Sequence, residues 1–180
     1  MSMDVLEVGN EAAAAPAKPV APAFVHLRVH SEYSIADGLV RIDDVVAAAA
    51  KDKQPALAIT DLANLFGMVK FYKAARGKGV KPLIGLDAWI TNDDNRDKPS
   101  RLLLLAKNQT GYQQLCELLS KAWLTNQHKG RAEIRPEWLE ALATSVSTLH
   151  PDQSQANGLI VLSGAHFGDV GTAIENGNLA

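Results

Sequence analysis

Short apolar segments alternate with segments of helical periodicity in the first half of this chain, and this alternation limits the folds it can adopt. The apolar segments are FVHLRVH (24–30), ALAIT (56–60) and VKPLIGLDAWI (80–90). Between them lie RIDDVVAAAAKD (41–52) and NLFGMVKFYKAARGKG (64–79), in which apolar residues recur at helical spacing. This β-α-β-α-β order predicts an α/β fold with a parallel sheet or a barrel, whose strands need cover on both faces.

The second half of the chain continues this pattern with fewer units. RLLLLA (101–106) predicts a strand, and TGYQQLCELLSKAW (110–123) predicts a helix in which Cys116 falls among core positions. A proline at position 136 favours a helix start, the polar run 144–157 indicates a surface insertion, and GLIVLSG (158–164) predicts another buried strand. A Gly-rich turn and a last helix would follow. These units are too few to close a barrel, so we expect a partial, distorted β/α barrel that is truncated at its C-terminus.

Composition adds limits on organisation and compartment. Residues 1–23 are rich in alanine and proline and predict a disordered tail, which leaves 24–180 as one folded unit. The formal net charge of -2 gives no general attraction to nucleic acid or membrane, and the single cysteine excludes an intrachain disulfide. Neither a membrane-spanning run nor a secretion signal is evident, so we expect a cytoplasmic protein without a membrane partner.

The stretch HLRVHSEYS (26–34) raises the question of a metal site. In an extended chain Arg28 and His30 share one face, and a guanidinium offers no lone pair to a metal. His30, Asp61 and Asp87 also stand at the predicted ends of strands, where functional side chains of parallel β/α folds gather. A divalent metal pocket is one interpretation. The simpler one is that these carboxylates cap helices and anchor loops.

A family resemblance adds to this interpretation. FVHLRVHSEYSIADGL, PALAITDLANLFGMVKFY, GVKPLIGLDAW, LLLLAKNQTGYQQL and GLIVLSG occur in this order. Together they resemble the opening region of the bacterial DNA polymerase III alpha subunits, which is a polymerase and histidinol phosphatase (PHP) domain. The resemblance implies that 24–180 is the N-terminal part of a PHP domain. It also implies that the polymerase active site, with its Mg²⁺, DNA and dNTPs, belongs to a region absent from this chain.

The resemblance also implies a set of metal-site positions, most of which depart from the family pattern. Family members with an intact site carry histidine at positions 28, 62 and 101, glutamate at 87 and often cysteine at 165. His30, Asp37 and Asp61 match the family. The implied vestigial pocket comprises Arg28, His30, Asp37, Asp61, Leu62, Asp87, Arg101 and Ala165. Since leucine and alanine have no ligand atom and arginine is a cation, we expect this chain to bind no metal.

The charges of these residues also favour a pocket without a metal ion. Three carboxylates in one pocket repel each other unless a cation lies among them, and Arg28 and Arg101 could be that cation. The alternative is that Arg28 points to solvent and Arg101 caps a strand.

We therefore expect a catalytically silent module of a replicative polymerase, with the polymerase activity in the full-length protein. Its implied partners are the proofreading exonuclease (epsilon) subunit and other replicase subunits. The alternative is an active metal-dependent phosphoesterase or 3'-5' exonuclease, and a truncated product without a role is a third possibility. Measuring the metal content would distinguish the catalytically silent module from the active metal-dependent enzyme.

Overall fold

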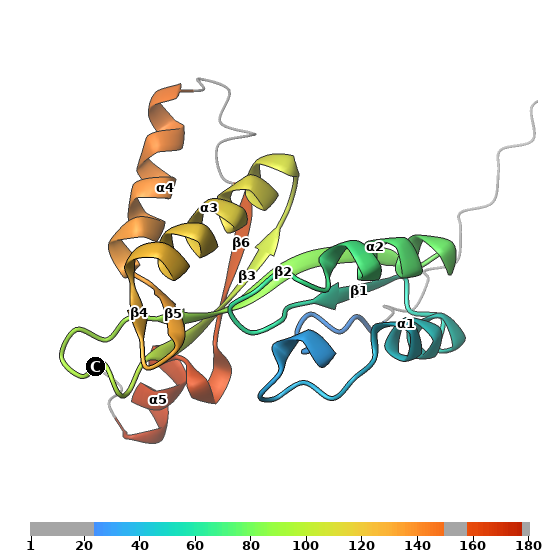
Figure 1. The fold of residues 1–180 in the computed structure, drawn as a ribbon, viewed down its shortest axis with the longest axis horizontal. Coiled ribbons are helices and arrows are strands. Elements are labelled where there is room, and N and C mark those ends of the chain that lie inside the picture. Colours follow the sequence, from blue (N-terminus) through green and yellow to red (C-terminus); the bar gives the residue numbers. More distant parts are fainter. Residues whose placement is uncertain (1–23, 150–157, 178–180) are drawn as a thin grey trace, which may run out of the picture.

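The computed structural model describes residues 24–149 and 158–177 and shows a mixed α/β fold (Figure 1). Its helices are α1 (Ile42–Lys51), α2 (Met68–Gly77), α3 (Gln109–Thr125), α4 (Pro136–Leu149) and α5 (Asp169–Glu175), and its short 3₁₀ turns are η1 (Glu32–Ser34) and η2 (Ala165–Phe167). Its strands are β1 (Ala56–Ile59), β2 (Lys81–Ile90), β3 (Ser100–Ala106), β4 (Gln127–His128), β5 (Arg131–Ile134) and β6 (Leu159–Ser163). The predicted α/β class is confirmed.

The long strand β2 joins the two halves of the sheet. Its first residues pair in parallel with β1, and its later residues pair with β3 on one side and with β5 on the other. The sheet order is β4-β5-β2-β3-β6, with β1 off this path. Figure 1 shows α1 and α2 beside β1, and α3 and α4 beside the other part of the sheet.

The prediction of a parallel sheet is wrong for β3 and β6. Strand β3 runs antiparallel to β2, and β6 runs antiparallel to β3. The connection 91–99 between β2 and β3 contains no helix, and a parallel connection needs a crossover of about a dozen residues or more. The described strands do not establish a barrel, because this strand order begins at β4 and ends at β6.

The predicted first strand is only an extended segment. Residues 24–30 belong to no strand, but the carbonyls of His26 and Val29 accept hydrogen bonds from the amides of Ala58 (2.9 Å) and Thr60 (2.9 Å). The segment thus follows β1 with irregular spacing, which still brings Arg28 and His30 alongside the sheet.

Two apolar clusters form the core. Helix α1 buries Ile42, Val46 and Ala49, which lie on one face at helical spacing, and these contact the apolar residues of β1 and α2. Helix α3 covers β2, β3 and β5 through a second cluster that includes Leu115 and Leu119. Each cluster fixes one wall of the region where the predicted site residues lie.

Three smaller predictions need correction, and one lies outside the described residues. Cys116 is only half-buried and is not a core residue. Strand β6 is an edge strand with Ile160 and Val161 about half exposed, so it is not buried. Helix α4 takes up 144–149 of the expected insertion, and 150–157 fall outside the described residues, as does the predicted tail 1–23. None of the helices in the described part of the chain has the length and apolarity that crossing a membrane requires.

Candidate functional site: an ion-pair cluster around Asp87

The antiparallel course of β3 brings the predicted site residues to one end of the sheet. Asp87 lies near the end of β2, and Arg101 lies at the beginning of β3. Because the two strands run in opposite directions, the beginning of β3 lies beside the end of β2, and Arg101 pairs with Trp89. The extended segment 24–30 supplies Arg28 and His30 from the side of β1.

The carboxylate of Asp87 is the centre of the cluster. Its side chain is fully buried, and its Oδ2 accepts hydrogen bonds from Arg28 Nε (2.8 Å) and His30 Nε2 (2.8 Å). Arg101 Nη1 approaches the same oxygen at 3.4 Å. A buried carboxylate requires such partners, because charge is costly to bury alone. Three cationic or ionisable side chains therefore share one oxygen of Asp87.

His30 bridges two carboxylates through both of its ring nitrogens. Nδ1 lies 3.0 Å from Asp37 Oδ1, and Nε2 lies 2.8 Å from Asp87 Oδ2. Burial by itself lowers the pKa of His30, but the hydrogen bond to Asp87 and the negative charges of Asp37 and Asp87 outweigh it, so the pKa is raised. Since both nitrogens face carboxylates, the geometry favours the doubly protonated imidazolium.

Arg101 is held between aromatic rings as well as by carboxylates. Its guanidinium carbon lies 4.3 Å from the ring centroid of Trp89 and 5.2 Å from that of Phe167. Its Nη2 lies 3.3 Å from Asp37 Oδ2, and the side chain is only 9% exposed. The cluster thus contains two guanidinium groups and His30 against the carboxylates of Asp37 and Asp87.

Asp61 lies outside this cluster, although the sequence predicts it there. Its carboxylate accepts hydrogen bonds from the backbone amide of Ser31 (2.6 Å) and from the hydroxyls of Ser31 (2.9 Å) and Ser34 (2.8 Å). Among the described residues, no cationic side chain lies within ion-pair distance of it. Asp61 therefore anchors the η1 turn, which is the role that the simpler interpretation gives to such carboxylates.

Leu62 and Ala165 bring no ligand atom to the cluster. Leu62 forms a backbone bridge with Asp87, while its side chain lines a neighbouring groove. Ala165 is exposed and begins η2 with a φ of 52°. The preceding residue, Gly164, packs so closely on β3 that an added Cβ would lie 2.2 Å from the carbonyl oxygen of Arg101.

These residues do not fit a divalent metal. The oxygen of Asp87 that faces the cluster already accepts from Arg28, His30 and Arg101, and both nitrogens of His30 are engaged. Two guanidinium groups would also repel a cation at this position. Within the part of the chain that the structure describes, no three His, Cys, Asp or Glu side chains are placed to hold one ion.

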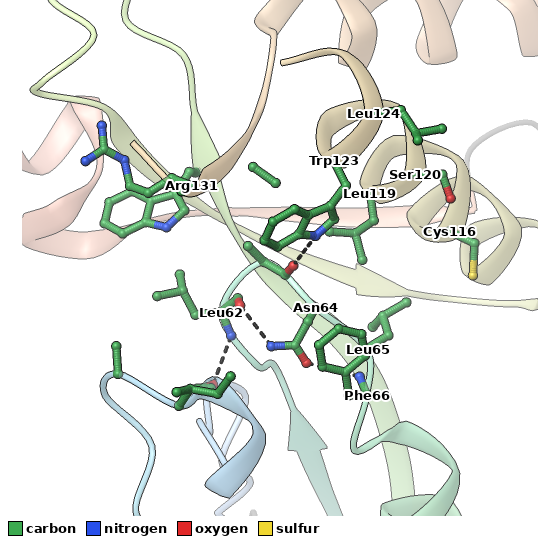
Figure 2. Close-up of a pocket in the computed structure, with 17 residues that line it drawn as sticks. Leu62, Asn64, Leu65, Phe66, Cys116, Leu119, Ser120, Trp123, Leu124 and Arg131 are labelled. Atoms are coloured by element: carbon green, nitrogen blue, oxygen red, sulfur yellow. Dashed lines mark hydrogen bonds between the residues drawn. The ribbon is translucent and has the colours of Figure 1, made fainter. Parts of the chain in front are cut away.

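A second feature, which the sequence did not predict, is a groove that Figure 2 shows in close-up; Trp89, which contacts Arg101, is one of its lining residues. It is an open groove of about 990 Å³ between the loops after η1 and β1, helix α3 and the β4-β5 hairpin. We call it the apolar groove; its lining is mostly apolar and includes Ile35, Leu62, Phe66, Trp123 and Leu124. In the sequence, Phe66 and Leu124 do not by themselves indicate a groove, because single exposed apolar residues are common on protein surfaces.

Comparison with known proteins decides the family. The PHP domain family model matches residues 26–180. The chain belongs to the PHP domain family. Among curated proteins, this PHP domain is similar to DNA polymerase III subunit alpha from several bacteria. That of Neisseria meningitidis serogroup A is 45% identical over 158 residues, which cover 87% of this chain and 13% of that protein.

A second relative gives the same result. The DNA polymerase III subunit alpha of Escherichia coli K12 is 44% identical over 159 residues, covering 88% of this chain and 13% of that protein. The PHP domain thus spans about an eighth of the length of these relatives. An amidohydrolase from Chromobacterium violaceum aligns over 54% of this chain and 32% of its own, with a TM-score of 0.44 and 21% identity. The expected likeness to the polymerase III alpha subunits is confirmed.

Proposed function

We propose that this PHP domain is a non-hydrolytic docking module of a bacterial replicative DNA polymerase, in which a metal site has degenerated into an ion-pair cluster. It belongs to the start of a partial β/α barrel in a longer cytoplasmic protein that copies DNA from dNTPs with Mg²⁺. Its partners are the proofreading exonuclease (epsilon) subunit and other replicase subunits. The hydrolytic alternative is an active metal-dependent phosphoesterase or 3'-5' exonuclease.

One observation supports the proposal that this domain has lost hydrolytic activity. The buried carboxylate of Asp87 has Arg28, His30 and Arg101 on one oxygen, in a position where a metalloenzyme would need a free ligand. A metal that replaced these partners would leave two guanidinium groups beside it. Hydrolysis of a phosphodiester by this family's route would then lack the ion that activates water.

Metal content and hydrolysis test the proposal together. The PHP domain is incubated with excess Mn²⁺ or Zn²⁺, passed through a desalting column, and its bound metal is measured by mass spectrometry. Cleavage of a 3'-mismatched oligonucleotide is followed in the same samples. We expect less than about 0.1 metal per chain and no cleavage above buffer, since too few free ligands remain.

A variant sharpens this experiment. His30→Gln removes the only imidazole of the cluster around Asp87, and with it the cluster's only nitrogen that could bind a metal. If the proposal holds, the parent and the variant bind the same negligible amount of metal and neither cleaves the oligonucleotide. Two or three metals per parent chain, with cleavage that His30→Gln abolishes, would favour the phosphoesterase or exonuclease.

Docking is tested separately with the exonuclease subunit of the same organism. Titration calorimetry should give a saturable one-to-one complex with this PHP domain, and a hydrolytically inactive domain that also fails to bind would contradict the docking role. In the full-length protein, DNA synthesis should persist in an Arg28→Met variant that folds, because the cluster takes no part in nucleotide transfer.

A further inference from the structure

The apolar groove exposes more hydrophobic surface than scattered surface residues explain. Ile35, Phe66 and Leu124 come from three separate segments, and their exposed fractions are 83%, 69% and 83%. All three line the same hollow of about 990 Å³, together with the half-buried ring of Trp123 (Figure 2). Contiguous apolar surface of this kind marks a binding surface more often than a random feature.

The walls of the groove are fixed by hydrogen bonds. Trp123 Nε1 donates to the carbonyl of Ala63 (3.0 Å), which ties helix α3 to the loop after β1. The amide of Leu62 donates to Ser34 Oγ (3.0 Å), which ties that loop to η1. Because neighbouring segments are joined in this way, the groove is preformed and a ligand would bind without first opening it.

Ile35 adds a sign of strain at the rim. It has a φ of 56°, a left-handed conformation that a β-branched residue rarely adopts, yet its side chain stays in solvent. Such strain is characteristic of binding and active sites. An exposed apolar residue that is kept in a costly conformation is better explained by a ligand than by the fold alone.

The chain itself contains a segment suited to this groove. The family match begins at residue 26, and the sequence before it opens with MSMDVLEV (1–8). Five of these eight residues are apolar, and Asp4 and Glu7 are its only charged side chains. We propose that residues 1–8 dock into the apolar groove of the same chain.

The charges of the groove and of the segment are complementary. Arg131 is the one charged residue among those that line the described groove. It shares the buried carboxylate of Glu133 with Arg96, whose Nη2 donates at 2.8 Å, so two guanidinium groups face one carboxylate. The surplus positive charge at this end of the groove favours a segment with Asp4 and Glu7 over a neutral or basic one.

The intervening chain is long enough. From Phe24 to Ser34, which lines the groove, the chain can span at most about 36 Å at about 3.6 Å per residue. Residues 9–23 contain three prolines, and fifteen residues in a polyproline conformation extend over about 46 Å. Residues 9–23 are therefore long enough to bring residues 1–8 from Phe24 to the side of the groove that Ser34 lines.

A tethered segment needs only modest affinity. A linker of this length gives an effective concentration in the millimolar range, so an intrinsic dissociation constant of about 0.1–1 mM would fill the groove half to nine-tenths of the time. A partner that uses the same groove would have to displace residues 1–8, which would make them a competitor in the same chain.

Cys116 provides the test, because it lines the groove and is the only cysteine of the chain. The rate at which a bulky maleimide modifies its thiol is measured in the 180-residue chain and in the double variant Val5→Asp/Leu6→Asp. The matched control is Ala12→Asp/Ala14→Asp, which adds the same charge to the linker. We expect the Val5/Leu6 variant to react about two- to tenfold faster than the parent, as the occupancy above requires, and the control to match the parent.

A synthetic peptide of residues 1–8, added at millimolar concentration, should slow the reaction again in the Val5/Leu6 variant. Equal rates in the parent and the Val5/Leu6 variant would overturn the proposal. A parent rate that falls with protein concentration would also overturn it, in favour of a second copy of the chain as the occupant.

Discussion

The guanidinium of Arg101 lies 4.3 Å from the ring centroid of Trp89, its direct cross-strand neighbour on β2. The side chain of Arg101 is only 9% exposed, and this pair explains how its positive charge can remain there. The ring face attracts the cation, while Asp37 and Asp87 neutralise it at longer hydrogen-bond distances of 3.3 and 3.4 Å. The aromatic contact is therefore part of the electrostatics of the cluster.

A double-mutant cycle should measure this contact. Trp89→Leu and Arg101→Met are combined, and the free energy of unfolding is measured by urea denaturation for all four proteins. We expect a coupling energy of about 1–2 kcal/mol, since desolvated cation–π pairs reach about 2 kcal/mol. A cycle between Trp138 and Lys121, whose Nζ lies 4.2 Å from the Trp138 ring centroid, serves as a more exposed comparison and should give less. Coupling below about 0.3 kcal/mol at Trp89 would mean that the ring and the cation act independently.

Asp87→Asn should be the most damaging single change in the cluster. It leaves Arg28 without its carboxylate partner and Arg101 with only Asp37, and removing one partner from a buried ion pair costs about 3–5 kcal/mol. Asp37→Asn is the control, because its side chain is 37% exposed and water can replace the lost contacts. Urea denaturation should therefore show a much larger loss for Asp87→Asn, and equal losses would mean that burial of Asp87 does not set the energy.

The sequence predicted the local structure well. The periodicity of 41–52 and 64–79 predicted α1 and α2, and the shared face of Arg28 and His30 predicted that both side chains reach the same place, which is Asp87. These features depend on neighbours within one segment. Local spacing determines them directly.

Features that depend on pairing between segments were harder to predict. The direction of β3, which brings Arg101 to Asp87, was signalled only by the short, helix-free connection 91–99. Asp61 was assigned to the pocket because it ends a strand, yet Ser31 and Ser34 satisfy its carboxylate first. A carboxylate at a strand end can bind either a cation or nearby hydroxyls, and spacing along one chain does not distinguish them.

The raised pKa of His30 predicts a specific dependence of stability on pH. Because the folded pKa lies above the ordinary value of 6.5, protonated His30 stabilises the fold fully below about pH 6.5, and this contribution is lost as the pH rises through the folded pKa. His30→Gln should therefore be less stable than the parent by about 1.5–3 kcal/mol at pH 5.5, the range for hydrogen bonds to charged groups. The difference should shrink toward pH 8.5.

Urea denaturation of both proteins across this pH range checks the prediction. His166→Gln is the matched control, since this histidine lies exposed on η2. A difference between His30→Gln and the parent that stays constant with pH would show that His30 does not change its protonation between the folded and unfolded states.

Gly164 should tolerate no side chain, although its φ of -73° is ordinary. A Cβ at this position would lie 2.2 Å from the carbonyl oxygen of Arg101, so the turn that carries Phe167 would have to move away from β3. We expect Gly164→Ala to lower the free energy of unfolding by about 1–3 kcal/mol, the usual cost of overpacking.

Gly77→Ala is the control, because Gly77 lies in α2 with no atom within 4 Å of the added Cβ. It should stabilise the protein by up to about 1 kcal/mol. If thermal melts show both variants shifted in the same direction, the contact between Gly164 and Arg101 does not constrain the cluster.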